Sequence, residues 1–251
     1  MSKIDLRLGD CLEVMKSIPN NSIDAIITDP PYGTTACKWD SVIDFELMWE
    51  QLNRIIKPNG AIVLFGSEPF SSALRMSNIK NYKYDWIWEK NNSTGFQLAS
   101  VMPLKKHEVI SIFSDGNTYP LSKNIARYIP QNLIEVNKVN KRGSKSKYLT
   151  ESGCKENSYI QKKTNYPTSI LKIDKVNKTV HPTQKPIALM EYLIKTYTNE
   201  NETVLDFTMG SGSTGVASKI LNRNFIGIEQ DANYFNIATD RICKDKQKEL
   251  F

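Results

Sequence analysis

The chain has 251 residues, enough to bury the core of one large α/β domain. Apolar residues make up 40% of it, but none of their runs is long enough to span a membrane, and the first residues lack the apolar region of a signal peptide. The four cysteines are scattered without a CxxC pair and only two histidines are present, so we expect free thiols, no metal site and a cytoplasmic location.

The positive charge is concentrated in one segment. Residues 122–178 contain thirteen basic residues against four acidic ones, a net charge of +9, whereas the rest of the chain carries −3. A localised basic block is expected of a surface that binds phosphates. A lysine-rich loop that only faces water would have the same composition.

Hydrophobic patterns alternate between strands and helices on both sides of that segment. The predicted strands are 3–8, 23–28, 61–65, 84–88, 108–113, 203–207 and 225–229, and the predicted helices are 12–18, 45–56, 69–76, 187–197, 216–221 and 231–244. Alternation of this kind predicts an α/β fold with a mainly parallel sheet covered on both faces.

The pattern dissolves between residue 114 and about residue 166 into Lys, Asn, Ser and Gly, which predicts an inserted, loop-rich lobe. We therefore expect residues 1–114 and 179–251 to be two halves of one domain. Residues 115–178 would be the insertion.

A glycine-rich turn follows the predicted strand 203–207. Gly210 and Gly212 allow the backbone to turn tightly and to come close to a ligand. About twenty residues later, the strand 225–229 ends in Glu229, where a carboxylate can accept both hydroxyls of a ribose. The pattern favours an adenosine-like ligand, although a plain tight turn with a surface glutamate also fits.

The sequence has no GxxxxGK[ST] motif, so it provides no lysine for the phosphates of ATP. A ligand with adenosine but without a polyphosphate fits better. S-adenosylmethionine is such a ligand.

A second motif, Asp29-Pro30-Pro31-Tyr32, follows the apolar run 23–28 and is called the DPPY motif below. Proline has no N–H to donate, so the strand must end here and leave a carboxylate and free carbonyls. The Asp29 carboxylate and the Pro30 carbonyl could each accept a hydrogen from an aromatic amine while Tyr32 stacks on the ring. These bonds would strengthen as positive charge builds on the nitrogen. A Pro-Pro turn with a surface tyrosine is the plain alternative.

Together these motifs resemble those of S-adenosylmethionine-dependent amino-group DNA methyltransferases of the permuted β group. In that group a (D/N/S)PPY motif precedes the target-recognition region and the cofactor glycine motif comes last. The DPPY motif matches the first, and Leu205–Thr214 resembles the last. His181–Pro186 resembles the motif before the cofactor helix, and Gly9–Cys11 resembles the motif that binds the adenine of the cofactor.

The resemblance implies a circularly permuted, Rossmann-like methyltransferase fold with a mixed, mainly parallel sheet of seven strands. The strands 203–207, 225–229 and 3–8 would lie side by side. The implied catalytic residues are Asp29, Pro30, Pro31 and Tyr32. The implied residues for S-adenosylmethionine are Asp10, Cys11, His181, Thr183, Lys185, Asp206, Thr208, Gly210, Ser211, Gly212, Ser213, Thr214 and Glu229, with Asp10 as the partner of the adenine amino group.

One departure from the family pattern concerns the glycine motif. The family usually has D-P-F-x-G-S-G, whereas here Asp206 is followed by Phe207-Thr208-Met209, so Thr208 occupies the aromatic position. Because Gly210 and Gly212 are intact, we expect cofactor binding to survive.

The implied substrate is double-stranded DNA, from which the target base must rotate out to expose its amine. The predicted DNA contacts are Lys38, Trp39, Arg127, Lys141, Arg142, Lys145 and Lys147, although Trp39 fits core or surface packing as well. Residues 115–178 would be the target-recognition region. The resemblance is also compatible with a homodimer and with a restriction endonuclease as functional partner.

An aspartate at the first position of the catalytic motif favours adenine N6 in this family, with cytosine N4 as the runner-up. Methylation of an RNA base or of a protein glutamine uses the same chemistry, but the latter enzymes usually have Asn-Pro-Pro-Tyr and lack a large basic insertion. A catalytically silent DNA-binding module is a further alternative, disfavoured by the intact DPPY motif and glycines.

Overall fold

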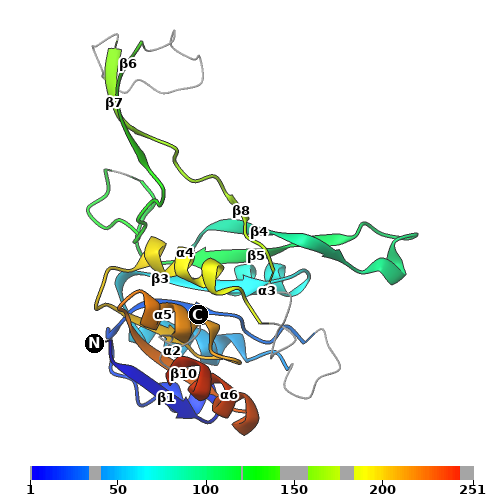
Figure 1. The fold of residues 1–251 in the computed structure, drawn as a ribbon. Helices are drawn as coiled ribbons and strands as arrows, with labels where there is room; N and C mark the ends of the chain where they lie inside the picture. The colour runs from blue at the N-terminus through cyan, green and yellow to red at the C-terminus, as the bar shows by residue number, and fades with distance from the viewer. Residues whose placement is uncertain (1, 34–40, 120, 142–157, 176–183, 244–251) are drawn as a thin grey trace, which may run out of the picture. The chain divides into compact units, whose positions relative to one another are not determined.

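The computed structural model describes residues 2–33, 41–119, 121–141, 158–175 and 184–243 (Figure 1). The chain divides into two compact units. The larger contains the chain up to Ile129 and from Ser169 onward, and the smaller is Pro130–Thr168.

The larger unit contains an eight-stranded sheet in the order β1-β10-β9-β2-β3-β5-β4-β8. These strands are β1 (Ile4–Leu8), β2 (Ile23–Thr28), β3 (Ile56–Gly66), β4 (Tyr82–Thr94), β5 (Lys105–Phe113), β8 (Ile170–Lys172), β9 (Thr203–Asp206) and β10 (Asn224–Glu229). β5 runs antiparallel to β3 and β4, and the other neighbouring pairs are parallel. The mixed, mainly parallel sheet and the adjacency of β9, β10 and β1 confirm the predicted fold class.

The sheet has one strand more than expected. β8 pairs in parallel with β4, with Ile87 opposite Ile170, and so extends the sheet at its edge. Its three residues are too few for a period of two to stand out in the sequence. The sequence therefore does not predict β8, because its strand conformation depends on pairing with β4 and not on its own residue pattern.

The helices are α1 (Cys11–Met15), α2 (Phe45–Ile55), α3 (Phe70–Ser77), α4 (Ile187–Tyr197), α5 (Ser213–Ile220) and α6 (Ala232–Cys243), with a short 3₁₀ helix η1 (Phe96–Leu98). An aspartate side chain caps the amino-terminal end of α1 and another caps that of α2. Asp10 Oδ1 accepts a hydrogen bond of 2.9 Å from the amide of Leu12, and Asp44 Oδ1 accepts one of 3.0 Å from the amide of Leu47. Both bonds satisfy amides that have no partner within the first helical turn.

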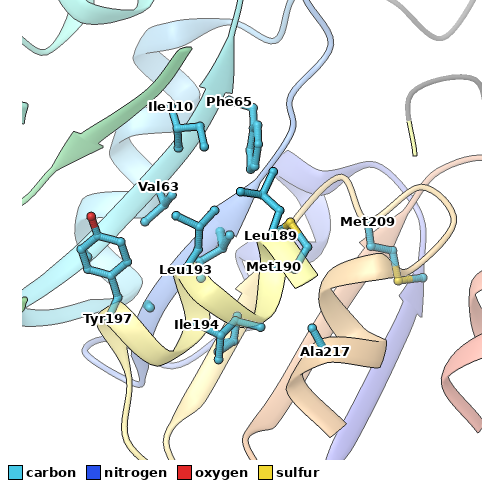
Figure 2. Packing of buried hydrophobic residues seen from close by; sticks show 14 of the residues in the cluster. Val63, Phe65, Ile110, Leu189, Met190, Leu193, Ile194, Tyr197, Met209 and Ala217 are labelled. Atoms are coloured by element: carbon cyan, nitrogen blue, oxygen red, sulfur yellow. The ribbon is translucent and has the colours of Figure 1, made fainter. Parts of the chain in front are cut away.

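Two apolar clusters cover the two faces of the sheet. One contains residues of α4, α5 and α6 together with Val63 and Phe65 of β3, and the other contains residues of α1, α2 and α3 together with Ile62 and Leu64. Figure 2 shows the side chains of α4 against those of β3 in the first cluster. Because both faces are buried, the centre of β3 is a continuous apolar run, as a strand between two helix layers requires.

The smaller unit contains one hairpin of β6 (Ile134–Lys141) and β7 (Ser158–Thr164), paired antiparallel. It lies inside the segment 115–178 that the sequence predicts to be inserted. Lys138, Lys162 and Lys163 are exposed on it. The hairpin has no clear periodicity in the sequence because it has no buried face.

Within the described part of the chain, no helix is both long and apolar enough to cross a membrane.

Candidate active site

The carboxyl ends of four adjacent parallel strands supply the predicted site residues. β1 is followed by Asp10, β10 ends in Glu229, β9 ends in Asp206, and β2 is followed by Asp29. Leu8 and Glu229 are register partners, so the ends of β1 and β10 lie level. In open α/β sheets, ligands bind at this edge. The permuted order of the motifs therefore places residues from both ends of the chain at one edge.

The Asp29 carboxylate has a donor on each oxygen. The hydroxyl of Tyr32 donates to Oδ1, and the ammonium group of Lys185 donates to Oδ2. The Asp29 side chain is 20% exposed and that of Lys185 only 8%. Burial raises the pKa of Asp29 and the charge of Glu108 raises it further, whereas Lys185 opposes both. Lys185 therefore favours the ionised carboxylate in an environment that disfavours charge.

Glu108 of β5 extends this pair. Its Oε2 atom lies 3.2 Å from Lys185 Nζ, and its Oε1 atom accepts a hydrogen bond from Lys90 of β4. Burial alone would raise the pKa of Glu108, but Lys185 and Lys90 together lower it to about 2. We call Lys90, Glu108, Lys185 and Asp29 the ion-pair chain. Its charges alternate in sign, so the four groups together are neutral.

Tyr32 lies between the carboxylate and the apolar core. Its hydroxyl is bound to Asp29, and its ring lies 5.0 Å from that of Phe70, centroid to centroid, at an interplanar angle of 30°. The hydrogen bond at its hydroxyl and the contact with Phe70 together fix the orientation of the Tyr32 ring. A ring that stacks on a base beside Asp29 needs such a fixed orientation.

Asp206 is the buried centre of a hydroxyl network. Its Oδ1 atom accepts a hydrogen bond of 2.5 Å from Thr28, and its Oδ2 atom accepts one of 2.5 Å from Thr214. Burial raises the pKa of Asp206 to about 6, although both hydroxyls oppose the shift. The network fastens β9 to β2 and to the start of α5.

Thr208, the departure from the family pattern, belongs to the same network. Its hydroxyl lies 2.8 Å from the hydroxyl of Thr28 and donates a hydrogen bond of 3.1 Å to the backbone carbonyl of Asp29. The phenylalanine of the family pattern could not donate that bond. Thr208 therefore connects the glycine turn directly to the DPPY motif.

The glycine turn is fixed by Glu229. The amide of Gly210 donates a 2.9 Å hydrogen bond to Glu229 Oε2, and the amide of Asp231 donates a 2.9 Å bond to Oε1. Gly210 has a φ of +51° and Gly212 one of +79°, the region that residues with a Cβ rarely adopt. The buried hydroxyl oxygen of Ser213 has no hydrogen-bond partner among the described residues. An unpaired buried polar atom of this kind suits a ligand-binding turn.

Replacing Gly212 with alanine is expected to lower the free energy of unfolding by about 2–4 kcal/mol. The new Cβ would lie 3.1 Å from Ala238 Cα and 2.9 Å from Ile242 Cδ1, and φ would be strained as well. Urea unfolding followed by circular dichroism measures the loss. Gly95→Ala is the matched control, because Gly95 has a φ of +91° but nothing within 4 Å. It should lose only the backbone part, about 1–2 kcal/mol; equal losses in both variants would refute close packing at Gly212.

A cavity of about 360 Å³ opens beside these groups, a volume within the range of about 300–1,000 Å³ typical of small-molecule sites. Its lining includes Gly9, Asp10, Cys11, Asp29–Tyr32, Ser41–Asp44, Lys185, Asp206–Ser211, Ser213, Thr214, Glu229 and Tyr234. The carboxylate of Glu229, the glycine turn and the DPPY motif thus share one cavity. This donor set fits a ligand that carries both an adenosine and a charged amino acid group.

Some predicted site residues lie outside the described residues or away from the cavity. His181, Thr183, Lys38, Trp39, Arg142, Lys145 and Lys147 lie outside the described residues, as does the side chain of Lys141. Arg127 belongs to the larger unit, where its guanidinium pairs with Glu202 at 2.6 Å and its amide donates to the carbonyl of Asn59. No group of His, Cys, Asp and Glu among the described residues could bind a metal ion.

Sequence reasoning missed Lys90, Glu108 and Thr28. Lys90 and Glu108 lie on the antiparallel pair β4 and β5, outside every motif, and meet Asp29 only through the strand order. Thr28 directly precedes the DPPY motif and could have been suspected from that position alone.

Comparisons with known proteins agree with this geometry. The model of a DNA methylase family, N6_N4_Mtase, matches residues 23–240. The Type II methyltransferase M.HinfI of Haemophilus influenzae is 29% identical over 266 residues, which cover 95% of this chain and 68% of that protein. M.HpaI of Haemophilus parainfluenzae is 30% identical over 256 residues, covering 95% and 74%. The crystal structure of an M1.HpyAVI–SAM complex matches with a TM-score of 0.60 and 28% identity, covering 95% of this chain and 99% of that one. The chain therefore belongs to the N6/N4 DNA methylase family and is an S-adenosylmethionine-dependent DNA amino-methyltransferase.

Proposed function

We propose that the chain transfers a methyl group from S-adenosylmethionine to the exocyclic N6 amine of an adenine rotated out of duplex DNA. The observation that carries the proposal is the position of the Asp29 carboxylate. It lies at the end of β2 and lines the same cavity as the glycine turn and Glu229. An acceptor for an amine and a site for a methyl donor thus share one cavity.

Glu229, Asp10 and the glycine turn would bind the cofactor. Each carboxylate oxygen of Glu229 accepts one amide hydrogen bond, so each has a lone pair left for a ribose hydroxyl. Asp10 caps α1 through Oδ1, which leaves Oδ2 for the adenine amine. When bound, S-adenosylmethionine supplies an electrophilic methyl group.

The DPPY motif would prepare the amine. The lone pair of an aromatic amine is delocalised into the ring, so hydrogen bonds to Asp29 and to the Pro30 carbonyl favour the geometry in which that lone pair can attack. The nitrogen would bond to the methyl carbon that the cofactor supplies while the electron pair of the carbon–sulfur bond goes to sulfur, and the methylated nitrogen would release one of its two protons to solvent. The ionised Asp29 stabilises the positive charge that develops, more strongly in the transition state than in the ground state.

The basic segment would bind the substrate. Lys138, Lys162 and Lys163 of the β6–β7 hairpin are exposed and can contact DNA phosphates, which predicts binding that weakens steeply with salt. Arg127, Lys141, Arg142, Lys145 and Lys147 remain proposed contacts, as do Lys38 and Trp39 near the flipped base. Residues 115–178 are proposed as the target-recognition region and the other two segments as the catalytic and cofactor halves. His181, Thr183 and Lys185 remain proposed cofactor contacts.

Adenine is proposed as the target because the motif begins with aspartate, and cytosine N4 is the second candidate because its exocyclic amine presents the same two hydrogens. The relatives M.HinfI and M.HpaI are named Type II methyltransferases, which supports pairing with a restriction endonuclease. A homodimer and a cytoplasmic location are part of the same proposal.

The test is to incubate the protein with methyl-labelled S-adenosylmethionine and, separately, duplex DNA, RNA or protein, and then to digest the labelled nucleic acids to nucleosides. We expect label in DNA as N6-methyladenine. Label only in RNA or protein would contradict the proposed substrate, and N4-methylcytosine would contradict only the proposed base.

A further inference from the structure

The ion-pair chain joins residues from four parts of the fold. Lys90 comes from β4 and Glu108 from β5, Lys185 lies just before α4, and Asp29 follows β2. The side chains of Lys90, Glu108 and Lys185 are 11%, 15% and 8% exposed. The buried ammonium groups also lie over aromatic rings, Lys185 Nζ at 4.9 Å from the centroid of Phe65 and Lys90 Nζ at 5.2 Å from that of Trp88. Charges in such surroundings are poorly screened, so each depends on its neighbours.

Lys185 contacts the carboxylates of Asp29 and Glu108 at different distances. It donates a hydrogen bond to Asp29 Oδ2, and its ammonium nitrogen lies 3.2 Å from Glu108 Oε2 in an ion pair. Glu108 Oε2 is a buried oxygen that has no hydrogen-bond partner among the described residues. Because this acceptor lies beside the ammonium group of Lys185, it offers that group a second position in which to form a hydrogen bond.

The two oxygens of Asp29 are both engaged, by Tyr32 and by Lys185. Each oxygen keeps one lone pair for an incoming amine, but a carboxylate that is still bonded to an ammonium group is a weaker acceptor for it. Lys185 has an alternative acceptor next to it, because Glu108 Oε2 is already within ion-pair distance.

We propose that Lys185 is a positioning residue that bonds Asp29 in the free enzyme and passes to Glu108 Oε2 when the target amine binds Asp29. Lys90 fixes Glu108 so that the open oxygen faces Lys185. The inference rests on the proposed function, because the amine that displaces Lys185 is that of the target base. Its consequence is that Asp29 is ionised before the base arrives and has a free acceptor site afterwards, while Lys185 always has an anionic partner.

Glu108→Gln separates this account from a purely electrostatic one. After burial and Lys185, the charge of Glu108 is a principal influence on Asp29, and it raises the pKa of that carboxyl. If Glu108 acted only through its charge, its removal would favour ionised Asp29 and leave methyl transfer unchanged or faster. If Lys185 passes to Glu108, the variant leaves Lys185 bound to Asp29 and methyl transfer slows.

The experiment compares single-turnover methyl transfer to duplex DNA by the wild-type chain, Glu108→Gln and Glu89→Gln. Glu89 is the matched control, a glutamate of β4 that pairs with Lys106 at 2.9 Å outside the ion-pair chain. For Glu108→Gln we expect a rate lower by about 10- to 100-fold, the loss that misplacement of a reacting group by about 1 Å produces. Binding of S-adenosylmethionine by calorimetry should not change, and the acid limb of the pH–rate profile should not move to higher pH. Glu89→Gln should match the wild type.

Glu108→Gln leaves the buried ammonium group of Lys90 without its anionic partner, which destabilises the fold. The double variant Lys90→Met with Glu108→Leu removes that buried charge and leaves Lys185 no second acceptor at this position, because leucine lacks the carbonyl oxygen that glutamine keeps. It should be as slow as the single variant. A wild-type rate in either folded variant would overturn the proposal. A wild-type chain that methylates no DNA would instead overturn the proposed function, so the two failures are distinguishable.

Discussion

Asp29→Ala is expected to lower the single-turnover rate of methyl transfer by at least about 10²- to 10³-fold, the range observed when one preorganised polar group is removed from a reacting centre. The variant loses the carboxylate that lies beside the cavity and is bonded by Tyr32 and Lys185. Binding of S-adenosylmethionine should remain largely intact, because Glu229 and the glycine turn lie on other strands. Single-turnover assays with labelled cofactor and calorimetric titration measure the two quantities separately.

Asp24→Ala is the matched control for this variant. Asp24 lies on the same strand, β2, but pairs with Lys57 Nζ at 2.7 Å and accepts a hydrogen bond from the amide of Thr203. Its loss should reduce stability while the rate per folded molecule stays near that of the wild type. Near-native turnover of Asp29→Ala would show that Asp29 does not accept the amine.

Lys185→Met is expected to lower the free energy of unfolding by about 3–5 kcal/mol at neutral pH, because removal of one partner leaves buried charge uncompensated. Asp29 and Glu108 would then face each other without the cation between them. The penalty should shrink as the pH falls, because protonation of a carboxylate removes the repulsion. Chemical unfolding at several pH values measures this dependence.

The same substitution should move the acid limb of the pH–rate profile to higher pH. Burial raises the pKa of Asp29 and Lys185 opposes that shift, so loss of Lys185 raises the pKa of Asp29 further. Activity needs the ionised carboxylate and is lost as the pH falls through its pKa. Lys106→Met is the control, since Lys106 is 50% exposed and pairs with Glu89 at the surface. It should change stability by no more than about 1 kcal/mol; an unshifted acid limb in Lys185→Met would show that Lys185 does not govern the ionisation of Asp29.

The sequence predicts those parts of the fold in which local patterns and strand ends agree. The DPPY motif ends β2 because proline cannot continue a sheet, and the glycine turn ends β9 because Gly210 and Gly212 adopt positive φ. Both predictions concern the carboxyl edge of parallel strands, where the backbone chemistry restricts the choice of residues.

The rest of the site depends on tertiary contacts that leave no local signal. Lys90 and Glu108 have the pattern of ordinary charged strand residues, and only the order β3-β5-β4 brings them to Lys185. The departure at Thr208 is explained in the same way, because its hydroxyl bonds the carbonyl of Asp29. The sequence does not predict the β6–β7 hairpin, because exposed strands need no alternation of apolar and polar residues.

In the proposed reaction, Asp29 receives the N6 amine of adenine in DNA. Its most direct test is to sequence, with detection of modified bases, the DNA of cells that express the wild-type chain or Asp29→Ala. We predict N6-methyladenine within one recurring sequence in the first DNA and none in the second. Modified cytosine in the first DNA, or the same modified adenine in both, would contradict the account.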